Sequence, residues 1–241
     1  CPTGRSGINC ERSCDGKADI TFVVDASGSI RENRFKMVLD YVAGVINNLE
    51  VGADRTRISL ITYSDNAAIR FHLNQFSRKE DILQVVKSQL WIQGKTNTAE
   101  ALRLARTEVF VESKGDRIDV PNYLIVLTDG QSNINAQMTV KEAVQARIEG
   151  AHIIVVTVTD KPTLEIKGIA SDPDDQNILF VENFAMLPSL SDRLVQAVCD
   201  DVNECFSSPC RNGGQCVDGL HQYLCFCDDE FSGLNCERRC G

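Results

Sequence analysis

Residues 19–29 read DITFVVDASGS, and this stretch decides the fold. Its first six residues are mostly apolar and β-branched, a composition that is typical of a strand. The segment that follows places apolar side chains at helical spacing: Phe35, Val38, Val42, Val45, Ile46 and Leu49. Side chains at this spacing fall on one face of a helix with about 3.6 residues per turn. We therefore expect a strand and an amphipathic helix, joined by the polar turn at residues 25–29.

The same alternation of strand and helix continues to residue 198. Further strands are predicted at residues 58–63, 68–72, 123–128, 153–157 and 178–181, and further helices at residues 81–90, 98–110, 140–149 and 187–198. Continuous apolar strands separated by helices imply a mostly parallel sheet that is covered on both faces. The predicted fold class is therefore α/β, with a doubly wound sheet.

Oxygen-bearing side chains follow the strands of this sheet, at the carboxyl ends where such sheets bind ligands. Asp25, Ser27 and Ser29 stand at alternate positions, and alternate residues of an extended loop project to one side. Thr96 precedes the helix at residue 98, and Asp129 follows the strand at residues 123–128. The pattern Asp-x-Ser-x-Ser alone is also typical of a capped turn. Its combination with Thr96 and Asp129 favours a metal site.

These five side chains offer two carboxylates and three hydroxyls. Hard oxygen ligands of this kind suit an octahedral cation such as Mg²⁺, which keeps several of its waters. Two carboxylates leave the cation able to attract a further anion. An acidic side chain from a partner protein is therefore expected to complete the coordination shell.

Residues 16–198 resemble a von Willebrand factor type A domain. The motif DASGS at residues 25–29, together with Thr96 and Asp129, matches that family's metal-ion-dependent adhesion site position by position. The resemblance implies a Rossmann-like sheet and a site for Mg²⁺ or Mn²⁺. It also implies that Ser27, Ser29 and Thr96 ligate the metal directly, while Asp25 and Asp129 act through water.

Cysteines occur only near the two ends of the chain. Of the 11 cysteines, Cys1, Cys10 and Cys14 come first, and the others lie between Cys199 and Cys240. Dense cysteines beside a long segment without any are typical of disulfides formed in an oxidising compartment. We therefore expect a secreted, extracellular protein.

Residues 1–14 align without gaps on residues 227–240, and three cysteines match in this alignment. Self-similarity of this kind indicates an array of repeats. Cys240 then holds the place of Cys14 and is expected to open a further repeat, which accounts for the odd number of cysteines. The chain is accordingly expected to be an excerpt or a processed fragment of a longer protein.

Six cysteines near the carboxyl end have a spacing that resembles an epidermal growth factor-like (EGF-like) module: Cys205, Cys210, Cys216, Cys225, Cys227 and Cys236. Six cysteines admit fifteen pairings in principle. The resemblance implies the pairs Cys205–Cys216, Cys210–Cys225 and Cys227–Cys236. The same comparison makes Cys1–Cys10 the last loop of a truncated module, and Cys14–Cys199 is expected to close the large domain.

Four segments are expected from these patterns. Residues 1–13 would be the tail of an EGF-like module, residues 14–199 the type A domain, residues 200–238 an EGF-like domain, and residues 239–241 the start of a further repeat.

The EGF-like segment resembles the calcium-binding subclass of its family. Asp201, Glu204 and Asp218 would supply carboxylates, and the backbone carbonyls would come from Val202, Gly219 and Gln222. Together they approach the six or more oxygens that Ca²⁺ requires. An acidic, solvated linker is the other interpretation of these residues. The resemblance also implies hydroxylation of Asp218 and an O-linked glucose on Ser207.

Several classes of function are excluded by the sequence. A formal net charge of −9 without Lys/Arg clusters opposes nucleic-acid binding. No apolar run approaches the roughly 18 residues that span a bilayer. The glycine-rich motifs of dinucleotide and nucleotide sites are absent, and no histidine is placed to activate Ser27 or Ser29. We therefore predict neither an enzyme nor a membrane-inserted protein.

The combination of modules resembles matrilins and related extracellular matrix proteins with tandem repeats. It implies an adhesion module that binds collagen or another matrix protein through its metal. A structural assembly unit whose copies self-associate is the alternative. Between the strands at residues 153–157 and 178–181, we predict no room for the extra short helix of collagen-binding integrin domains, which argues against an integrin-like way of binding collagen.

Overall fold

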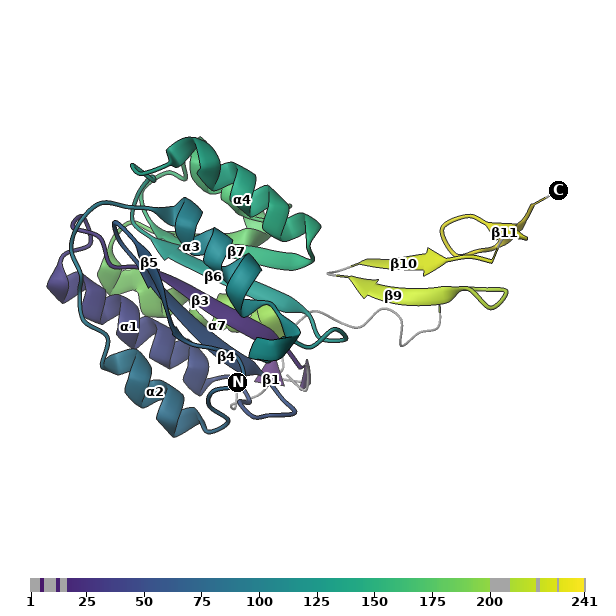
Figure 1. Cartoon of the computed structure of the whole chain (residues 1–241), viewed down its shortest axis with the longest axis horizontal. Helices are drawn as coiled ribbons and strands as arrows, with labels where there is room; N and C mark the ends of the chain where they lie inside the picture. Colours follow the sequence, from purple (N-terminus) through teal and green to yellow (C-terminus); the bar gives the residue numbers. More distant parts are fainter. Residues whose placement is uncertain are drawn as a thin grey trace. The chain divides into compact units, whose positions relative to one another are not determined.

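The computed structural model of the chain describes residues 5–6, 12–13, 17–199, 209–219, 222–228 and 230–240. The chain divides into two compact units, Cys1–Cys199 and Asp200–Gly241. Each unit has its own secondary structure and is described by itself (Figure 1). Within these described ranges, no helix is both long and apolar enough to cross a membrane.

The larger unit centres on a six-stranded sheet. Its strands are, in spatial order, β5 (Ala67–Phe71), β4 (Arg57–Tyr63), β3 (Asp19–Asp25), β6 (Asn122–Thr128), β7 (Ala151–Val158) and β8 (Ile178–Val181). Every neighbouring pair is parallel except β4 and β5, which are antiparallel. The prediction of a mostly parallel α/β sheet is confirmed.

Helices cover both faces of this sheet (Figure 1). One face carries α1 (Glu32–Asn47), α2 (Lys79–Lys87), the 3₁₀ helix η3 (Phe184–Leu190) and α7 (Ser191–Cys199). The other carries α3 (Thr98–Leu104), its π-helical continuation η1 (Ala105–Val109), α4 (Ala136–Ile148) and α5 (Leu164–Ile169). Two short helices, η2 (Glu112–Lys114) and α6 (Asp174–Asn177), lie in the connections.

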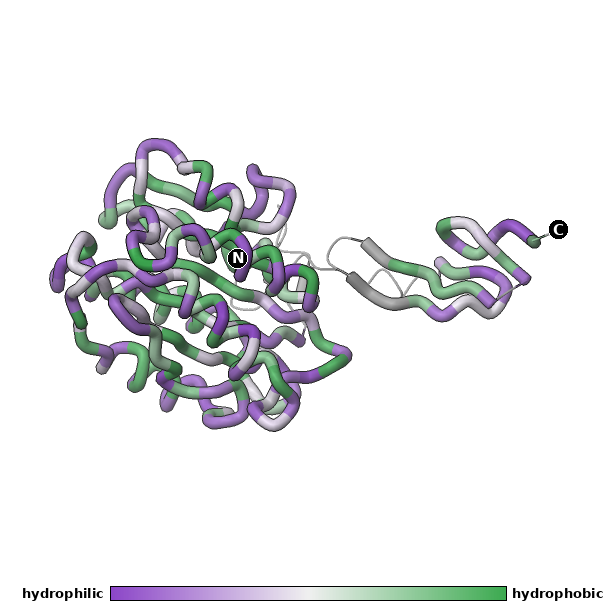
Figure 2. The backbone as a smooth tube through the Cα atoms, turned by 45° about the horizontal axis from the view of Figure 1, so that its top comes forward, coloured by the Kyte–Doolittle hydropathy of each residue, from purple (hydrophilic) through white to green (hydrophobic). Residues whose placement is uncertain are grey.

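The core lies between the sheet and these helices. All seven residues of β3 are buried, as expected for a central strand covered on both faces. On the side of α3 and α4, the sheet contributes Val23, Tyr63 and Val126 to a cluster that also holds Ala101 and Ala143. In Figure 2 the segments that run through the interior of this unit are largely hydrophobic, and many of the outer segments are hydrophilic. This packing fixes the strand ends from which the polar loops emerge.

Two helices begin earlier than the sequence predicts, and one connection contains helices that were not predicted. α2 begins at Lys79 rather than at residue 81, and α4 begins at Ala136 rather than at residue 140. Between β7 and β8 the structure places the short helices α5 and α6, where no helix was predicted. That the extra short helix of collagen-binding integrin domains has no room there stays a prediction. The Thr163 hydroxyl accepts the backbone N–H of Ile166 and thereby caps α5.

Short antiparallel pairs make up the rest of the described chain. In the smaller unit β9 (Gln215–Gly219) pairs with β10 (Gln222–Phe226), and β11 (Phe231–Ser232) pairs with β12 (Arg238–Arg239). β1 (Arg5–Ser6) and β2 (Arg12–Ser13) pair in the first unit.

Disulfides join Cys210 to Cys225 and Cys227 to Cys236, which are two of the pairs that the resemblance implies. Cys216 is also disulfide-bonded. The partner proposed for it, Cys205, lies outside the described residues, as do Cys1, Cys10 and Cys14. Among the described cysteines, Cys240 is free and exposed.

Candidate metal centre

The candidate site begins where β3 ends at the carboxyl edge of the sheet. Asp25, the last residue of β3, is 0% exposed. The next residue, Ala26, is still hydrogen-bonded to the neighbouring strand β4, because its backbone N–H donates to the Tyr63 carbonyl at 2.8 Å. The chain then turns sharply, and the Ser27 backbone N–H donates to Asp25 Oδ1 at 2.8 Å. This turn holds the Asp25 carboxylate and the Ser27 hydroxyl at the same strand end.

Hydrogen bonds link this turn to the loop after β6. Ser27 Oγ lies 3.1 Å from Ser29 Oγ, and the Ser29 hydroxyl donates to Asp129 Oδ1 at 2.7 Å. Asp129 is 100 residues away in sequence and directly follows β6, which pairs with β3. The fold thus brings four of the five predicted side chains into one bonded cluster.

The fifth predicted residue, Thr96, lies in a segment that is tied to both loops. Gly28 donates its backbone N–H to the Gly94 carbonyl at 2.9 Å, and Gln93 donates to the Ala26 carbonyl at 3.0 Å. On the other side, the Thr96 backbone N–H donates to Asn133 Oδ1 at 2.9 Å. Thr96 is 5% exposed. The segment therefore holds Thr96 between the loops that follow β3 and β6.

Glycine is required at Gly94 for this close approach. Its φ of +103° is a conformation that residues with a side chain rarely adopt. A Cβ at this position would also lie 2.7 Å from Asp65 Oδ2. That carboxylate is fixed, because its Oδ1 accepts the Lys95 backbone N–H at 2.8 Å. A side chain at Gly94 would therefore displace the segment that carries Thr96.

Three further residues, which were not predicted from the sequence, support the cluster. The Thr128 hydroxyl donates to Asp25 Oδ2 at 2.9 Å, and the Trp91 indole N–H donates to the Ser27 carbonyl at 2.9 Å. Asn133 accepts the bond from Thr96. A signal for Thr128 was available, because it is the polar end of an otherwise apolar strand. No comparable pattern marks Trp91 or Asn133, whose roles depend on tertiary contacts.

Burial disfavours the ionised form of both carboxylates in the cluster. Desolvation raises the pKa of Asp25 from 3.8 to about 6, although Ser27 and Thr128 donate hydrogen bonds to it. Desolvation also raises the pKa of Asp129, which the Ser29 hydroxyl partly offsets. A bound divalent cation would lower the pKa of both carboxylates, because a nearby positive charge stabilises the ionised form.

The donor set fits such a cation. It is composed entirely of oxygens, with one carboxylate buried at Asp25 and one partly buried at Asp129, and the hydroxyls of Ser27 and Ser29 lie between them. These are ligands for Mg²⁺ or Mn²⁺ rather than for soft metals. Over the residues that the structure describes, no cluster of three or more His, Cys, Asp or Glu side chains could hold a metal ion. A cation here would therefore depend on hydroxyls as much as on carboxylates.

The predicted calcium ligands are only partly within the described ranges. Asp201, Val202 and Glu204 lie outside them, as does Ser207. Asp218 and Gly219 end β9 and Gln222 begins β10, so these residues share one end of the hairpin, where Gly219 pairs with Gln222. The calcium site and the two modifications stay predictions.

The sequence matches two families over these two units. Residues 19–193 match the von Willebrand factor type A domain, and residues 205–235 match the EGF-like domain. The chain belongs to the von Willebrand factor type A domain family. The candidate metal centre described above lies inside this type A domain.

Relatives with the same domain are matrix proteins and not enzymes. Mouse collagen alpha-4(VI) chain is 33% identical over 187 residues, covering 77% of this chain and 8% of the relative. Bovine matrilin-1 is 29% identical over 239 residues, covering 96% of this chain and 43% of the relative. The chain thus spans less than half of the length of these relatives.

A solved relative contains a metal in the corresponding motif. Proximal thread matrix protein 1 from the mussel byssus, with a zinc-occupied metal-ion-dependent adhesion site, superposes with a TM-score of 0.70 at 30% identity. The match covers 77% of this chain and 46% of that protein. The type A fold of that protein therefore accepts a divalent cation.

Proposed function

We propose that the type A domain binds an acidic side chain of an extracellular matrix protein through Mg²⁺ or Mn²⁺. The observation that carries the proposal is the bonded cluster of Ser27, Ser29 and Asp129 beside the buried Asp25. Five oxygens from this cluster and Thr96 would hold the cation. Its direct protein ligands would be neutral hydroxyls, with both carboxylates acting through water, so the dipositive ion stays attractive to a carboxylate from outside.

The cation would supply the positive charge that attracts the ligand, and the chain's own residues would set its position. Ser27 and Ser29 would turn their hydroxyl lone pairs toward the metal. Asp25 and Asp129, with Thr128 behind them, would orient bound water. None of these groups performs a covalent step, so the expected outcome is reversible adhesion.

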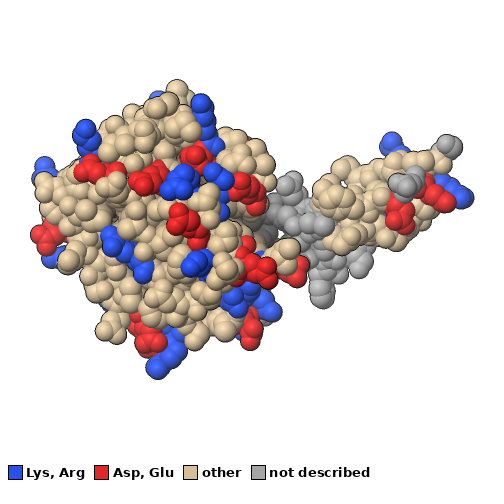
Figure 3. All heavy atoms as spheres, in the orientation of Figure 1, with Lys and Arg blue, Asp and Glu red and all other residues tan. Residues whose placement is uncertain are grey.

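The proposed setting is the extracellular matrix, and the proposed ligands are collagen or another matrix protein. The names of the relatives support this setting, since they include a collagen chain and matrix proteins. Acidic and basic side chains are interspersed on the face of the type A domain seen in Figure 3. This pattern supports a local, metal-centred contact over a broad electrostatic one. A Ca²⁺ ion at the EGF-like module remains part of the proposal.

Metal titration tests the first half of this proposal. Isothermal titration calorimetry should show Mg²⁺ or Mn²⁺ binding to the native chain and its loss in Asp25→Ala and Asp129→Ala variants. Asp40→Ala is the control, because Asp40 is an exposed residue of α1. Unchanged affinity in both site variants would contradict the assignment of the metal centre.

A solid-phase screen of matrix proteins, including collagens and immobilised copies of this chain, tests the second half. Binding should require the metal, disappear with chelator and be lost in the Asp25→Ala variant. Binding only to the immobilised chain would favour self-association as the function. Binding that survives chelator would contradict a metal-mediated contact.

A further inference from the structure

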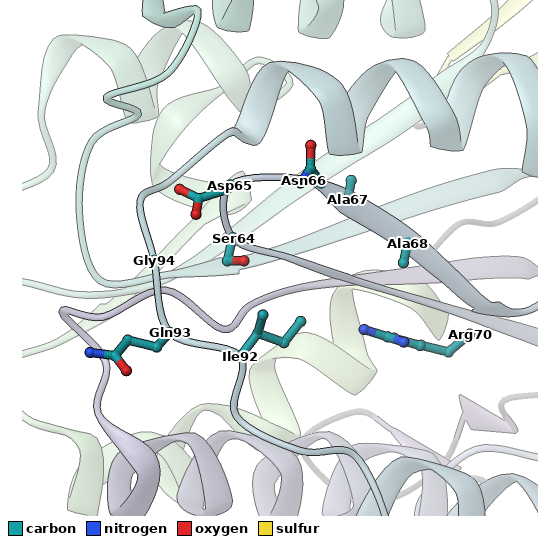
Figure 4. A pocket seen from close by; sticks show the side chains of 9 residues that line it. All are labelled: Ser64, Asp65, Asn66, Ala67, Ala68, Arg70, Ile92, Gln93 and Gly94. Carbon is teal, nitrogen blue, oxygen red and sulfur yellow. The ribbon is translucent and has the colours of Figure 1, made fainter.

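A recess adjoins the candidate metal centre at the edge of the sheet that β5 forms. It has a volume of about 560 Å³ and lies between the start of the edge strand β5 and the segment at residues 92–94. Figure 4 shows the side chains that line it, among them Ser64, Asn66, Ala68, Arg70, Ile92 and Gln93. We call it the Arg70 recess.

The walls of the Arg70 recess are the same loops that position the metal ligands. One wall ends at Gly94, which accepts the backbone N–H of Gly28 from the metal-binding turn. The other wall includes Ser64, whose carbonyl accepts the Asn97 backbone N–H at 2.9 Å. Thr96 stands between these two connections. A ligand held at the metal would therefore lie next to the recess.

The side chain of Arg70 lies on the face of the sheet that α1 and α2 cover. Its hydrogen-bond partner Thr62 lies between Ile61 and Tyr63, which both belong to the core cluster on the opposite face, so alternation along β4 turns Thr62 the other way and the Arg70 guanidinium lies beside it. The Arg70 guanidinium is directed along the recess toward Ile92 (Figure 4). Its Nε–H donates to Thr62 Oγ1 at 2.6 Å, which leaves both Nη groups for another partner.

No carboxylate among the described residues pairs with Arg70. The salt bridges formed by the described residues do not include it, although the chain is acidic overall with a net charge of −9. Asp65, the acidic residue that also lines the recess, is held by the Lys95 backbone N–H. The recess therefore presents one exposed guanidinium beside apolar and amide side chains.

The distance to the metal centre fits a short extended peptide. Tyr63 pairs with both Asp25 and Ala67. The register shift in β5 places Arg70 between the levels of Ile61 and Leu60, two strands and two to three residues away from Asp25. With strand spacings of about 4.8 Å and a rise of about 3.3 Å per residue, the two backbones are about 13 Å apart. Roughly four residues of extended chain cover this distance.

We infer that the Arg70 recess binds a second carboxylate of the ligand that the metal holds. This inference rests on the proposed function and specifies its ligand class: an extended acidic segment with two carboxylates about four residues apart. One carboxylate completes the metal shell, and the other accepts hydrogen bonds from the Nη groups of Arg70. Planar guanidinium groups are suited to such bidentate pairing.

Synthetic peptides test this inference with the full chain. We would titrate ¹⁵N-labelled protein in Mg²⁺ with a glycine- and serine-rich peptide of about ten residues that carries one Asp, and with versions that carry a second Asp one or four positions away. The four-position peptide should bind about tenfold more tightly than the one-Asp peptide, and the one-position peptide should gain little. In Arg70→Gln the advantage should vanish, while the affinity for the one-Asp peptide is unchanged.

The matched control is Arg78→Gln, which removes the same charge from an exposed arginine just before α2. This variant should keep the tenfold advantage of the four-position peptide. An advantage that is independent of spacing, or that survives Arg70→Gln, would overturn the inference and leave the proposed function intact. Failure of every peptide to bind in a metal-dependent manner would instead overturn both.

Discussion

The hydroxyl of Thr128 donates a hydrogen bond to Oδ2 of Asp25 across the sheet, at 2.9 Å. Thr128 is the last residue of β6, and Asp25 is the last residue of the neighbouring β3. The other oxygen of the same carboxylate accepts the Ser27 backbone N–H. Both oxygens of Asp25 are thus oriented before any metal arrives. Groups of this kind, behind the metal ligands, set the geometry of a metal site.

Thr128→Val should weaken Mg²⁺ or Mn²⁺ binding by about tenfold or more, within the range for partners that orient metal ligands. The valine keeps the shape of the side chain but cannot hold Asp25 Oδ2. Calorimetric titration of the metal measures the effect.

The fold offers a matched control for this variant. Thr157 of β7 stands directly opposite Thr128 in the sheet, is fully buried, and has a hydroxyl without a hydrogen-bond partner. Thr157→Val should leave metal affinity unchanged and leave the unfolding free energy equal or higher by about 1 kcal/mol, since no bond is lost. Equal metal affinities of the two variants would contradict the role of Thr128.

Asp25→Asn should stabilise the metal-free chain at pH 7.5. Burial raises the pKa of Asp25 to about 6, so the folded state holds its proton more tightly than the unfolded state does. The contribution of Asp25 to stability is therefore present below about pH 4 and is lost as the pH rises to about 6. A shift of about two pKa units corresponds to roughly 3 kcal/mol. The variant avoids this loss because an amide does not ionise.

The surroundings of Asp25 can accommodate the amide. Its oxygen can accept the Ser27 N–H, and its NH₂ can donate to Thr128, whose hydroxyl can turn to the Gly130 carbonyl 3.2 Å away. Urea unfolding in chelator from pH 4.5 to 7.5 measures the difference between variant and native chain, with Asp40→Asn as the exposed control. A difference that does not grow with pH would contradict the prediction, and added Mg²⁺ should reverse its sign.

Strong patterns in the sequence predicted most of the sheet. Central strands such as β6 and β7 are mostly apolar because both of their faces are buried, and this signal needs no tertiary information. The start of α4 was misplaced because its buried residues are Thr139, Ala143 and Ala146, which form only a weak hydrophobic stripe. α5 was missed because a helix of six residues shows too little periodicity.

The candidate site was predictable to the extent that it lies in strand-end loops. Asp25 ends one apolar strand and Asp129 follows another, and the topology of a doubly wound sheet brings such ends together. The direction of β5, and with it the place of Arg70, could not be predicted, since an apolar run looks alike in parallel and antiparallel pairs. Trp91 is fixed by a hydrogen bond to a residue 64 positions away. Such contacts exist only in the folded chain.

Cys240 should be the only thiol that reacts with iodoacetamide in denaturant without reductant. It is free and exposed, and the five proposed disulfides would account for the other ten of the 11 cysteines. Peptide mapping by mass spectrometry locates the label, and Cys240→Ser should take up none. Label on Cys14 or Cys199 would contradict the proposed closure of the type A domain by these two residues.

Arg117→Ala should destabilise the type A domain without changing its metal affinity. Asp19 begins β3 at the edge opposite Asp25 and is 0% exposed. Arg117 donates to both oxygens of this carboxylate, including an Nη2–Oδ1 contact of 2.6 Å and a backbone N–H bond of 2.9 Å. Removal of the guanidinium leaves a buried carboxylate without its counter-charge, which costs about 3–5 kcal/mol.

Lys36→Ala is the control for this loss. Lys36 forms a 3.1 Å ion pair with Glu32 on α1, but both side chains are exposed, so its removal should cost no more than about 0.5 kcal/mol. Adding Asp19→Asn to Arg117→Ala should recover part of the stability, because the buried charge is then removed as well. Urea unfolding measures all three variants, and calorimetry with Mg²⁺ compares their metal affinities. A comparable loss in Lys36→Ala would contradict the importance of burial for the Arg117–Asp19 pair. A metal affinity that falls with Arg117→Ala would show that the two ends of β3 do not act independently.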